Sequence, residues 1–249
     1  MKRAALLVFL ALLAAGCDRY PTVEDGDYLS IAVVCPDGRA QCPPIANGAS
    51  ILGVEACTRA KDRKSGLKVV LRISPLEFQN PPDLNQKSVY TASLTGNPCV
   101  TATFVTRTSP DLIRIDAEMG DYRTDPIWLQ AQAADIATIE LLPQPAVLTV
   151  GSTSTIKLNA MVLTTNGRVT NGTRVFFNAI ATPPTGSAYV WPGSAIVDLT
   201  KTPPTAEATL VTGPSVTSVQ VELTAVPPPV EGLPDIAPLT RTFTMAGSQ

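Results

Sequence analysis

The chain has no histidine, few aromatic residues and few charges. Of its 249 residues, 5% are aromatic and 16% are charged. Without histidine, Ser-His-Asp and Cys-His catalysis and the usual His-rich metal sites are excluded. We find no Gly-rich phosphate loop and no nucleophile elbow either. The sequence therefore predicts a protein that is not an enzyme and that has no cofactor site and no metal site.

An excess of positive charge is also lacking. The 19 basic and 21 acidic residues give a formal net charge of −2. A nucleic-acid partner needs a basic field for its phosphates, so we expect none. The paired acids Asp116 and Glu118 lie two residues apart, and we interpret them as solvated surface because nothing around them signals a pocket.

Near its start the chain has an apolar run that is short. Residues 4–15 are uncharged and apolar, and they follow Lys2 and Arg3. Twelve residues are too few to span a bilayer of roughly 30 Å, so the run predicts a signal peptide over residues 1–16. Residues 17–27 are polar and predict a short tether.

The end of the apolar run, Leu13-Ala14-Ala15-Gly16-Cys17, resembles the lipobox of bacterial lipoproteins. The resemblance implies cleavage after Gly16 and acylation of Cys17, with palmitate among the acyl chains. Such a lipid anchor would hold the mature chain on the exported side of a bacterial membrane, outer or inner. The alternatives are an ordinary secretory signal cut near Ala15 and an uncleaved apolar tail.

The rest of the chain contains an internal repeat. Four blocks recur in the same order, at offsets that grow from 104 to 108 residues. The matched blocks are 48–58 with 151–162, 66–71 with 172–177, 101–106 with 207–212, and 113–117 with 221–225. Four ordered matches indicate duplication of a unit of about a hundred residues.

Each repeated block alternates apolar and polar residues and is bounded by Gly, Pro, Asn or Asp. In the block 151–162, Leu158 and Ala160 are apolar while Lys157 and Asn159 are polar, which is the pattern of a strand with one buried face. The Asn166-Gly167 pair fits a tight reversal of the chain. Short strands separated by such turns predict an all-β fold built of antiparallel β-sandwiches.

The second unit resembles a bacterial Ig-like domain of the invasin and intimin type. The resemblance rests on the sequence from Ile139 to Pro145 and on the segments 151–154, 166–169, 172–177, 206–210 and 219–225. It implies two tandem Ig-like antiparallel β-sandwiches, over residues 28–134 and 137–246. In that family such units act as stacked spacers in surface adhesins, and the resemblance includes no functional-site motif.

Four cysteines remain besides Cys17, and in an exported chain an even number indicates disulfides. Cys35, Cys42, Cys57 and Cys99 permit three connectivities. In the Ig-like strand order the segments that hold Cys57 and Cys99 are neighbours in one sheet, and the repeat points both side chains outward. This resemblance favours a Cys57–Cys99 bond and leaves Cys35 with Cys42.

Two tryptophans remain to be explained. Trp191 and Tyr189 lie two apart in a possible strand and share a face, which is suited to stacking on a sugar or a peptide. Packing in the core or at a domain seam is the other interpretation. Trp128 lies near the join between the units, and we expect it to pack in the last strand of the first unit.

Two functional hypotheses follow. The first is a non-enzymatic, lipid-anchored cell-envelope protein whose tandem domains act as a spacer and as a module for adhesion or protein interaction. The alternative is an accessory envelope lipoprotein that binds glycan or a partner protein through the loops of one sandwich. The expected partners are therefore the membrane, through the anchor, and an envelope or surface protein or a glycan.

Overall fold

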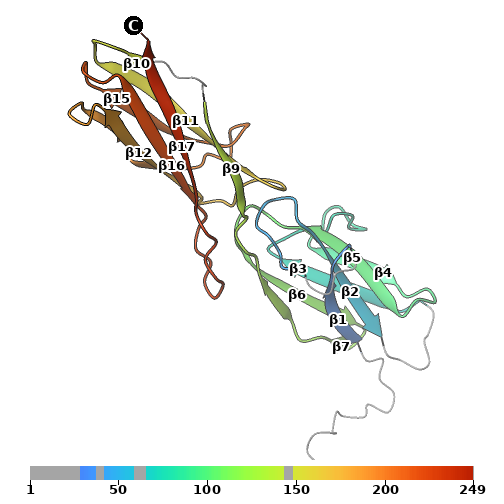
Figure 1. Cartoon of the computed structure of the whole chain (residues 1–249). Coiled ribbons are helices and arrows are strands. Elements are labelled where there is room, and N and C mark those ends of the chain that lie inside the picture. The colour runs from blue at the N-terminus through green and yellow to red at the C-terminus, as the bar shows by residue number, and fades with distance from the viewer. Residues whose placement is uncertain (1–28, 38–41, 59–65, 143–147, 249) are drawn as a thin grey trace, which may run out of the picture.

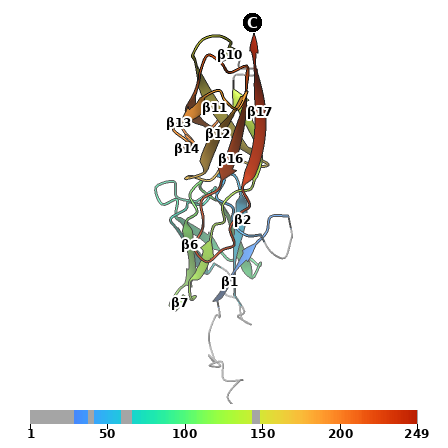
Figure 2. The ribbon, with the colours of Figure 1, turned by 60° about the vertical axis from the view of Figure 1, so that its left-hand side comes forward.

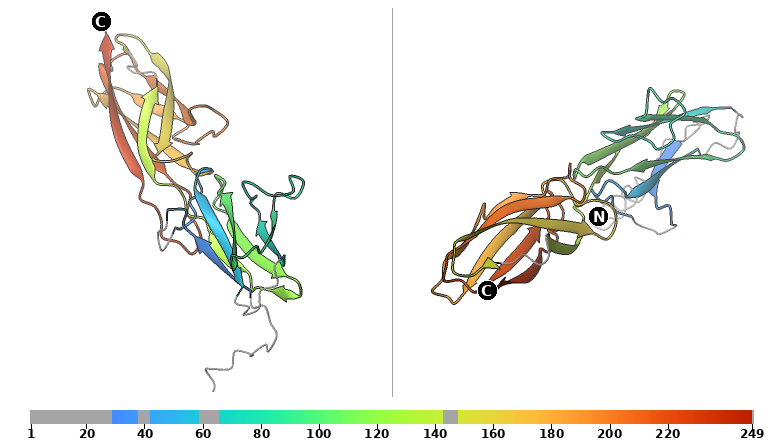
Figure 3. Two further views of the ribbon diagram at one scale, coloured as in Figure 1. Left: turned by 90° about the vertical axis from the view of Figure 1, so that its right-hand side faces the viewer. Right: turned by 90° about the horizontal axis from the view of Figure 1, so that it is seen from above.

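The computed structural model describes residues 29–37, 42–58, 66–142 and 148–248. Over these ranges the chain is all-β, and its strands form four sheets. The sheets pair into two sandwiches that lie end to end (Figure 1). The two sandwiches also lie end to end when the molecule is viewed from other directions (Figures 2 and 3). The predicted all-β, Ig-like fold class is confirmed. None of the described residues forms a helix long and apolar enough to span a membrane.

The first sandwich consists of β1 to β8. One sheet has the order β1-β2-β5, and the other has the order β4-β3-β6-β7 with β8 also paired to β6. The strands are β1 (Leu29–Val34), β2 (Ile51–Thr58), β3 (Lys68–Ser74), β4 (Val89–Ser93), β5 (Cys99–Val105), β6 (Leu112–Met119), β7 (Tyr122–Arg123) and β8 (Ile127–Gln130).

The second sandwich consists of β9 to β17. Its sheets have the orders β13-β15-β11-β9 and β10-β17-β16-β12-β14, and only β10 and β17 pair in parallel among these described strands. The strands are β9 (Ile136–Leu142), β10 (Leu148–Thr149), β11 (Ser154–Thr164), β12 (Arg174–Thr182), β13 (Ala188–Trp191), β14 (Ser194–Ile196), β15 (Thr205–Thr212), β16 (Ser218–Val226) and β17 (Leu239–Ser248).

Each sandwich has its own hydrophobic core, which the alternating residues of its strands supply. Leu52, Val54 and Ala56 of β2 are buried in the first core, and Leu158 and Ala160 of β11 are buried in the second. The polar residues between them lie on the outer faces of the sheets. The period-2 pattern read from the sequence therefore assigns these strands to the correct face.

The internal repeat is visible in the strand pairing. Cys57 of β2 is directly opposite Cys99 of β5, and in the second sandwich Met161 is directly opposite Thr205. The aligned blocks place Met161 at the position of Cys57 and Thr205 at that of Cys99. The same two strands thus pair in the same register in both sandwiches.

A second equivalent pair differs in register. Strands β3 and β6 pair in the first sandwich as β12 and β16 do in the second. Aligned by the repeat, Leu71 and Ala117 correspond to Phe177 and Ala225, but Phe177 pairs with Leu223. The shift is two residues, and because the side-chain period of a strand is two, every side chain keeps its face.

The two sandwiches are joined through the side chain of Thr170, which is 1% exposed. Its hydroxyl accepts a hydrogen bond from the backbone N–H of Ala134 at 2.7 Å and donates one to the carbonyl of Ala46 at 2.9 Å. A hydroxyl has one proton to donate, so this single group satisfies one buried donor and one buried acceptor. Thr170 of the second sandwich is therefore tied both to the first sandwich and to the segment between them.

Asn47 makes a second connection at the joint. Its side-chain amide donates to the carbonyl of Asn166 at 3.0 Å, and its own carbonyl accepts from the N–H of Arg168 at 2.8 Å. Gly167 lies between these two contacts with φ of +73°, and a Cβ there would be 2.6 Å from the Asn47 carbonyl oxygen. Strands β11 and β12 lie in different sheets, so the Asn166-Gly167 segment does not close a hairpin; it packs against the first sandwich.

The loop between β16 and β17 also reaches the joint. This loop, residues 227–238, extends from the second sandwich towards the first (Figure 1). Together with Gln132 and Ala133 it encloses a hollow of only about 20 Å³. The segment that links the sandwiches is therefore covered by protein on this side.

We expect Thr170→Val to weaken the joint, because it leaves the Ala134 N–H and the Ala46 carbonyl buried without a partner. Each unsatisfied buried group costs roughly 1–3 kcal/mol, so the loss of both partners should lower the free energy of unfolding by roughly 2–6 kcal/mol. Urea unfolding measures the loss. Thr170→Ser keeps the hydroxyl and is the matched control; an equal loss in both variants would contradict this role of the hydrogen bonds.

The Cys57–Cys99 bond should contribute more stability than the Cys35–Cys42 bond. The two bonds close loops with sequence separations of 42 and 7 residues, for which the chain-entropy model gives about 4 and about 2 kcal/mol. Replacing both cysteines of one pair by alanine leaves no free thiol, so the two double variants can be compared directly.

The measurement is unfolding followed by the fluorescence of one tryptophan at a time, Trp128 of β8 in a Trp191→Phe background and Trp191 of β13 in a Trp128→Phe background. The Trp128 transition should shift in both double variants and more in the one that lacks Cys57 and Cys99. The Trp191 transition should stay nearly unchanged, because the second sandwich contains no cysteine. A larger shift from loss of the shorter loop would refute the ranking.

Candidate functional site

The expected modification site lies outside the described residues. Cys17 belongs to residues 1–28, of whose structure nothing is described. The other four cysteines are described. The structure contains the disulfides Cys35–Cys42 and Cys57–Cys99, which is the pairing that the Ig-like resemblance favours.

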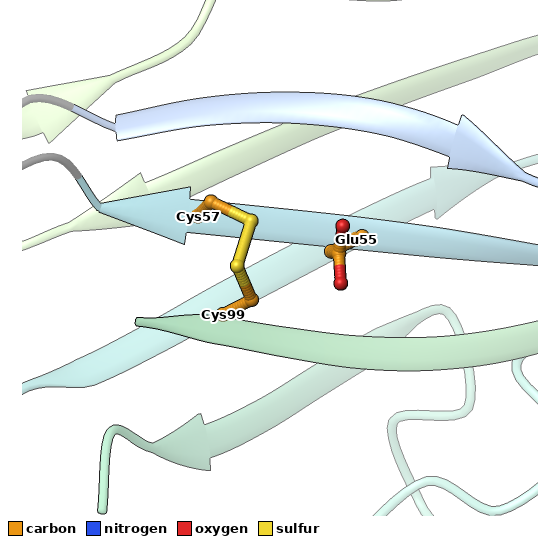
Figure 4. A group of neighbouring side chains, drawn as sticks. All are labelled: Glu55, Cys57 and Cys99. Carbon is orange, nitrogen blue, oxygen red and sulfur yellow. A yellow bond between two sulfur atoms is a disulfide. The ribbon is translucent and has the colours of Figure 1, made fainter. Parts of the chain in front are cut away.

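Glu55, Cys57 and Cys99 form the one group of potential metal ligands found among the described residues. Their ligand atoms all lie within 4.8 Å of one another on the outer face of β2 and β5 (Figure 4). The two sulfur atoms are bonded to each other, and metal ions bind thiolates. With the disulfide intact, Glu55 alone retains a ligand atom, so the cluster does not constitute a metal site.

Tyr189 and Trp191 lie together on the outer face of the second sandwich. They belong to β13, the edge strand of its sheet, and are 58% and 73% exposed. Because they are two residues apart in a strand, their side chains point to the same side. They pack neither in the core nor at the seam between the sandwiches, so of the two interpretations left open by the sequence the exposed pair is the one observed.

The strand pairing shows what surrounds the two rings. Trp191 is opposite Thr209 of β15, which is opposite Lys157 of β11. In the next row Tyr189 is opposite Val211, which is opposite Thr155. The rings therefore lie along one margin of a surface that continues across three strands.

A small charge cluster borders this surface. Glu207 of β15 pairs with Lys157 at 2.9 Å and also with Lys201. Hydrogen bonds from Lys201 and then from Lys157 lower the pKa of Glu207, so its carboxylate stays ionised near neutral pH. Two ammonium groups thus share one carboxylate beside Thr209.

The pairing of β13 with β15 could not be read from the sequence. The aligned repeat contains no block that corresponds to residues 188–191, so nothing placed Thr155, Thr209 or Val211 beside the aromatic pair. The alternation of apolar and polar residues along β11 and β15 is the signal that could have indicated the rest of this surface. It identifies the outward residues without saying which strand lies next to them.

Trp128 lies in the last strand of the first sandwich, as the sequence predicts, but the expectation that it packs there is wrong. It is 54% exposed on β8 and does not pack in the core of the first sandwich. The guanidinium of Arg114, on the paired strand β6, lies 5.8 Å from the centre of the Trp128 ring. Leu112 is also exposed on this face of β6, and the Trp128 ring lies within cation–π distance of Arg114.

The acids on the same face of β6 are bound by arginines. Asp116 pairs with Arg72 at 3.6 Å and with Arg114 at 3.3 Å. Glu118 pairs with Arg72 at 2.8 Å and with Arg123 at 3.3 Å. These carboxylates belong to a network of ion pairs in which their side chains are only 21% and 23% exposed, so they are less solvated than the sequence interpretation expects.

A hollow in the first sandwich lies beside the segment that connects β3 to β4. It measures about 500 Å³ and is lined by residues 73–77 and 84–88. Its charged members are Glu77 and Lys87, whose carboxylate and ammonium groups lie 3.7 Å apart. Its lining contains no cysteine and a single carboxylate, that of Glu77, which is paired with Lys87.

Comparison with known proteins gives matches at the level of structure. No family model matches the chain, and no curated protein sequence matches it. The adhesin InvE of Yersinia pseudotuberculosis is 13% identical, with a TM-score of 0.49 over 89% of this chain and 59% of its own. The Escherichia coli adhesin FdeC is 15% identical, with a TM-score of 0.37 over 90% of this chain and 66% of its own.

Invasin, a bacterial integrin-binding protein, is 17% identical and has a TM-score of 0.50 over 87% of this chain. This chain spans 39% of the length of that invasin structure and 59% of the InvE structure. At this identity the likeness to invasin supports the fold alone. The chain is thus an all-β protein of two tandem Ig-like sandwiches, similar in fold to the adhesin invasin.

Proposed function

We propose that this protein is a non-enzymatic, lipid-anchored component of a bacterial cell envelope. Its two sandwiches, residues 28–134 and 137–246, act as a spacer and as a module for adhesion or protein interaction. Cys17 carries the lipid, residues 17–27 form the tether, and the mature chain lies on the exported side of the outer or inner membrane. Its partners are the membrane and an envelope or surface protein.

The observation that carries this proposal is the hydrogen-bonded joint between the sandwiches. A spacer must hold its far end at a set distance and direction from the membrane. Buried contacts from Thr170 and Asn47 restrain the two bodies in the end-to-end arrangement, where an unsupported linker would let them rotate independently. The fold shared with invasin is compatible with the same role.

A second candidate function is favoured by the exposed aromatic pair. An accessory lipoprotein that binds glycan or a partner protein needs a recognition surface, and Trp191 and Tyr189 provide one. They lie on strand β13, so the surface is a sheet face and not the loops that the sequence suggested. The two functions are compatible, since a spacer can present a binding face.

We expect Cys17→Ser to abolish lipid modification, because the thiol is the acceptor of the lipid. Metabolic labelling with a palmitate analogue tests this directly, and the variant should also leave the membrane fraction. Asp18→Asn changes the next residue but keeps the thiol, so it should be labelled like the natural chain. A labelled, membrane-bound Cys17→Ser protein would overturn the anchor.

A further inference from the structure

The outer face of β13, β15 and β11 combines exposed rings with free hydroxyl groups. Within the described part of the chain, the side-chain hydroxyls of Thr155 and Thr209 form no hydrogen bond with protein atoms. Each hydroxyl can therefore donate a hydrogen bond to a ligand and accept one from it. Thr209 of β15 lies directly opposite Trp191. In the next row, Val211 of β15 lies between Tyr189 and Thr155 of β11.

The charge on this face is close to balanced. On the three strands the charged residues are Lys157 and Glu207, and Lys201 joins them from a neighbouring loop. Residues 184–193, which include β13 and its flanks, have no charged side chain. The rings thus lie in an uncharged strip, with the Lys–Glu–Lys cluster on the far side of Thr209.

This composition distinguishes between classes of ligand. A nucleic acid or an acidic polymer needs a basic surface, and here Glu207 offsets one of the two lysine charges, so the cluster carries a single net positive charge. The core of a protein interface is a contiguous apolar patch. Here the residues next to the two rings on β15 and β11 are mostly polar: Thr209, Lys157 and Thr155, with Val211 the one apolar member. A neutral sugar chain has apolar ring faces and many hydroxyls, and it matches both parts of the surface.

We propose that this face binds a neutral polysaccharide chain. The rings of Tyr189 and Trp191 stack on sugar faces, and the hydroxyls of Thr209 and Thr155 bond to sugar hydroxyls. Lys157 and Glu207 supply further donors and acceptors at the border. The proposal rests on the second function given above and names its site and the chemical class of its ligand.

The chain has two tryptophans, one in each sandwich, and this permits a sharp test. Trp128→Phe leaves Trp191 as the single tryptophan, and Trp191→Phe leaves Trp128. Each full-length, anchored protein in detergent is titrated with a dextran, a mannan and a β-glucan. At least one should produce a saturable change in Trp191 fluorescence, and none should change that of Trp128.

Affinity electrophoresis in gels that contain the same polysaccharides measures the contribution of each ring. Trp191→Ala and Tyr189→Ala should each weaken binding about tenfold or more. Phe176→Ala is the matched control, because Phe176 is an exposed ring, 45% accessible, on the other sheet of the same sandwich. It should leave the affinity unchanged. Thermal unfolding verifies that the variants remain folded.

Three results would overturn the proposal. The first is absence of binding to all three polysaccharides, and the second is binding that survives both alanine variants. The third is binding only to an acidic polysaccharide such as alginate, lost in salt, which would indicate an electrostatic site. If an envelope protein were captured and then lost with Trp191→Ala, while no polysaccharide bound, the sugar assignment would fail and the interaction function would stand.

Discussion

The arrangement of the two sandwiches depends on the hydrogen bonds at their joint, and the buried hydroxyl of Thr170 makes two of them. Thr170 donates to the first sandwich and accepts from the segment between the sandwiches, in a place where water cannot replace either bond. Asn47 and the glycine at position 167 extend this contact, because the close approach of the two backbones leaves no room for a Cβ at that glycine. Without these contacts the two sandwiches would be separate bodies on a linker, and neither could set the direction of the other.

The joint gives the surface of the second sandwich a fixed relation to the first. Strand β17 ends at the end of the molecule that lies farthest from the first sandwich (Figure 1). The aromatic face of β13 belongs to this distal body, and the proposed anchor belongs to the other end of the chain. A fixed joint would therefore hold the aromatic face away from the membrane and aim it in one direction, which unites the two proposed functions.

The duplication was predictable from the sequence because each repeated block is a short stretch in which apolar and polar residues alternate. The blocks around Cys57 and Cys99 match those around Met161 and Thr205, and the structure pairs both sets in the same register. The joint was not predictable, because its side-chain contacts join residues 36 to 124 positions apart through turn residues that look ordinary. Asn166-Gly167 has the composition of a hairpin turn, and only the tertiary packing reveals its other role.

The candidate site was predictable in part for a similar reason. Two residues that are two apart in a strand point to the same face, so the sequence alone places the side chains of Tyr189 and Trp191 on one face. Whether that face meets solvent depends on which strands cover it: Trp128 lies in the last strand of the first sandwich, as expected, but its ring is exposed where packing was expected. Pattern gives the face of a side chain, while exposure is decided by the neighbours.

The most direct test of the central claim is to measure whether the two sandwiches tumble as one body. Residual dipolar couplings of the Cys17→Ser protein, partially aligned in solution, report the orientation of each backbone N–H bond. We predict that a single alignment tensor fits the couplings of both sandwiches, with their relative orientation as in Figure 1. Two tensors of different magnitude would show independent motion and would contradict the account.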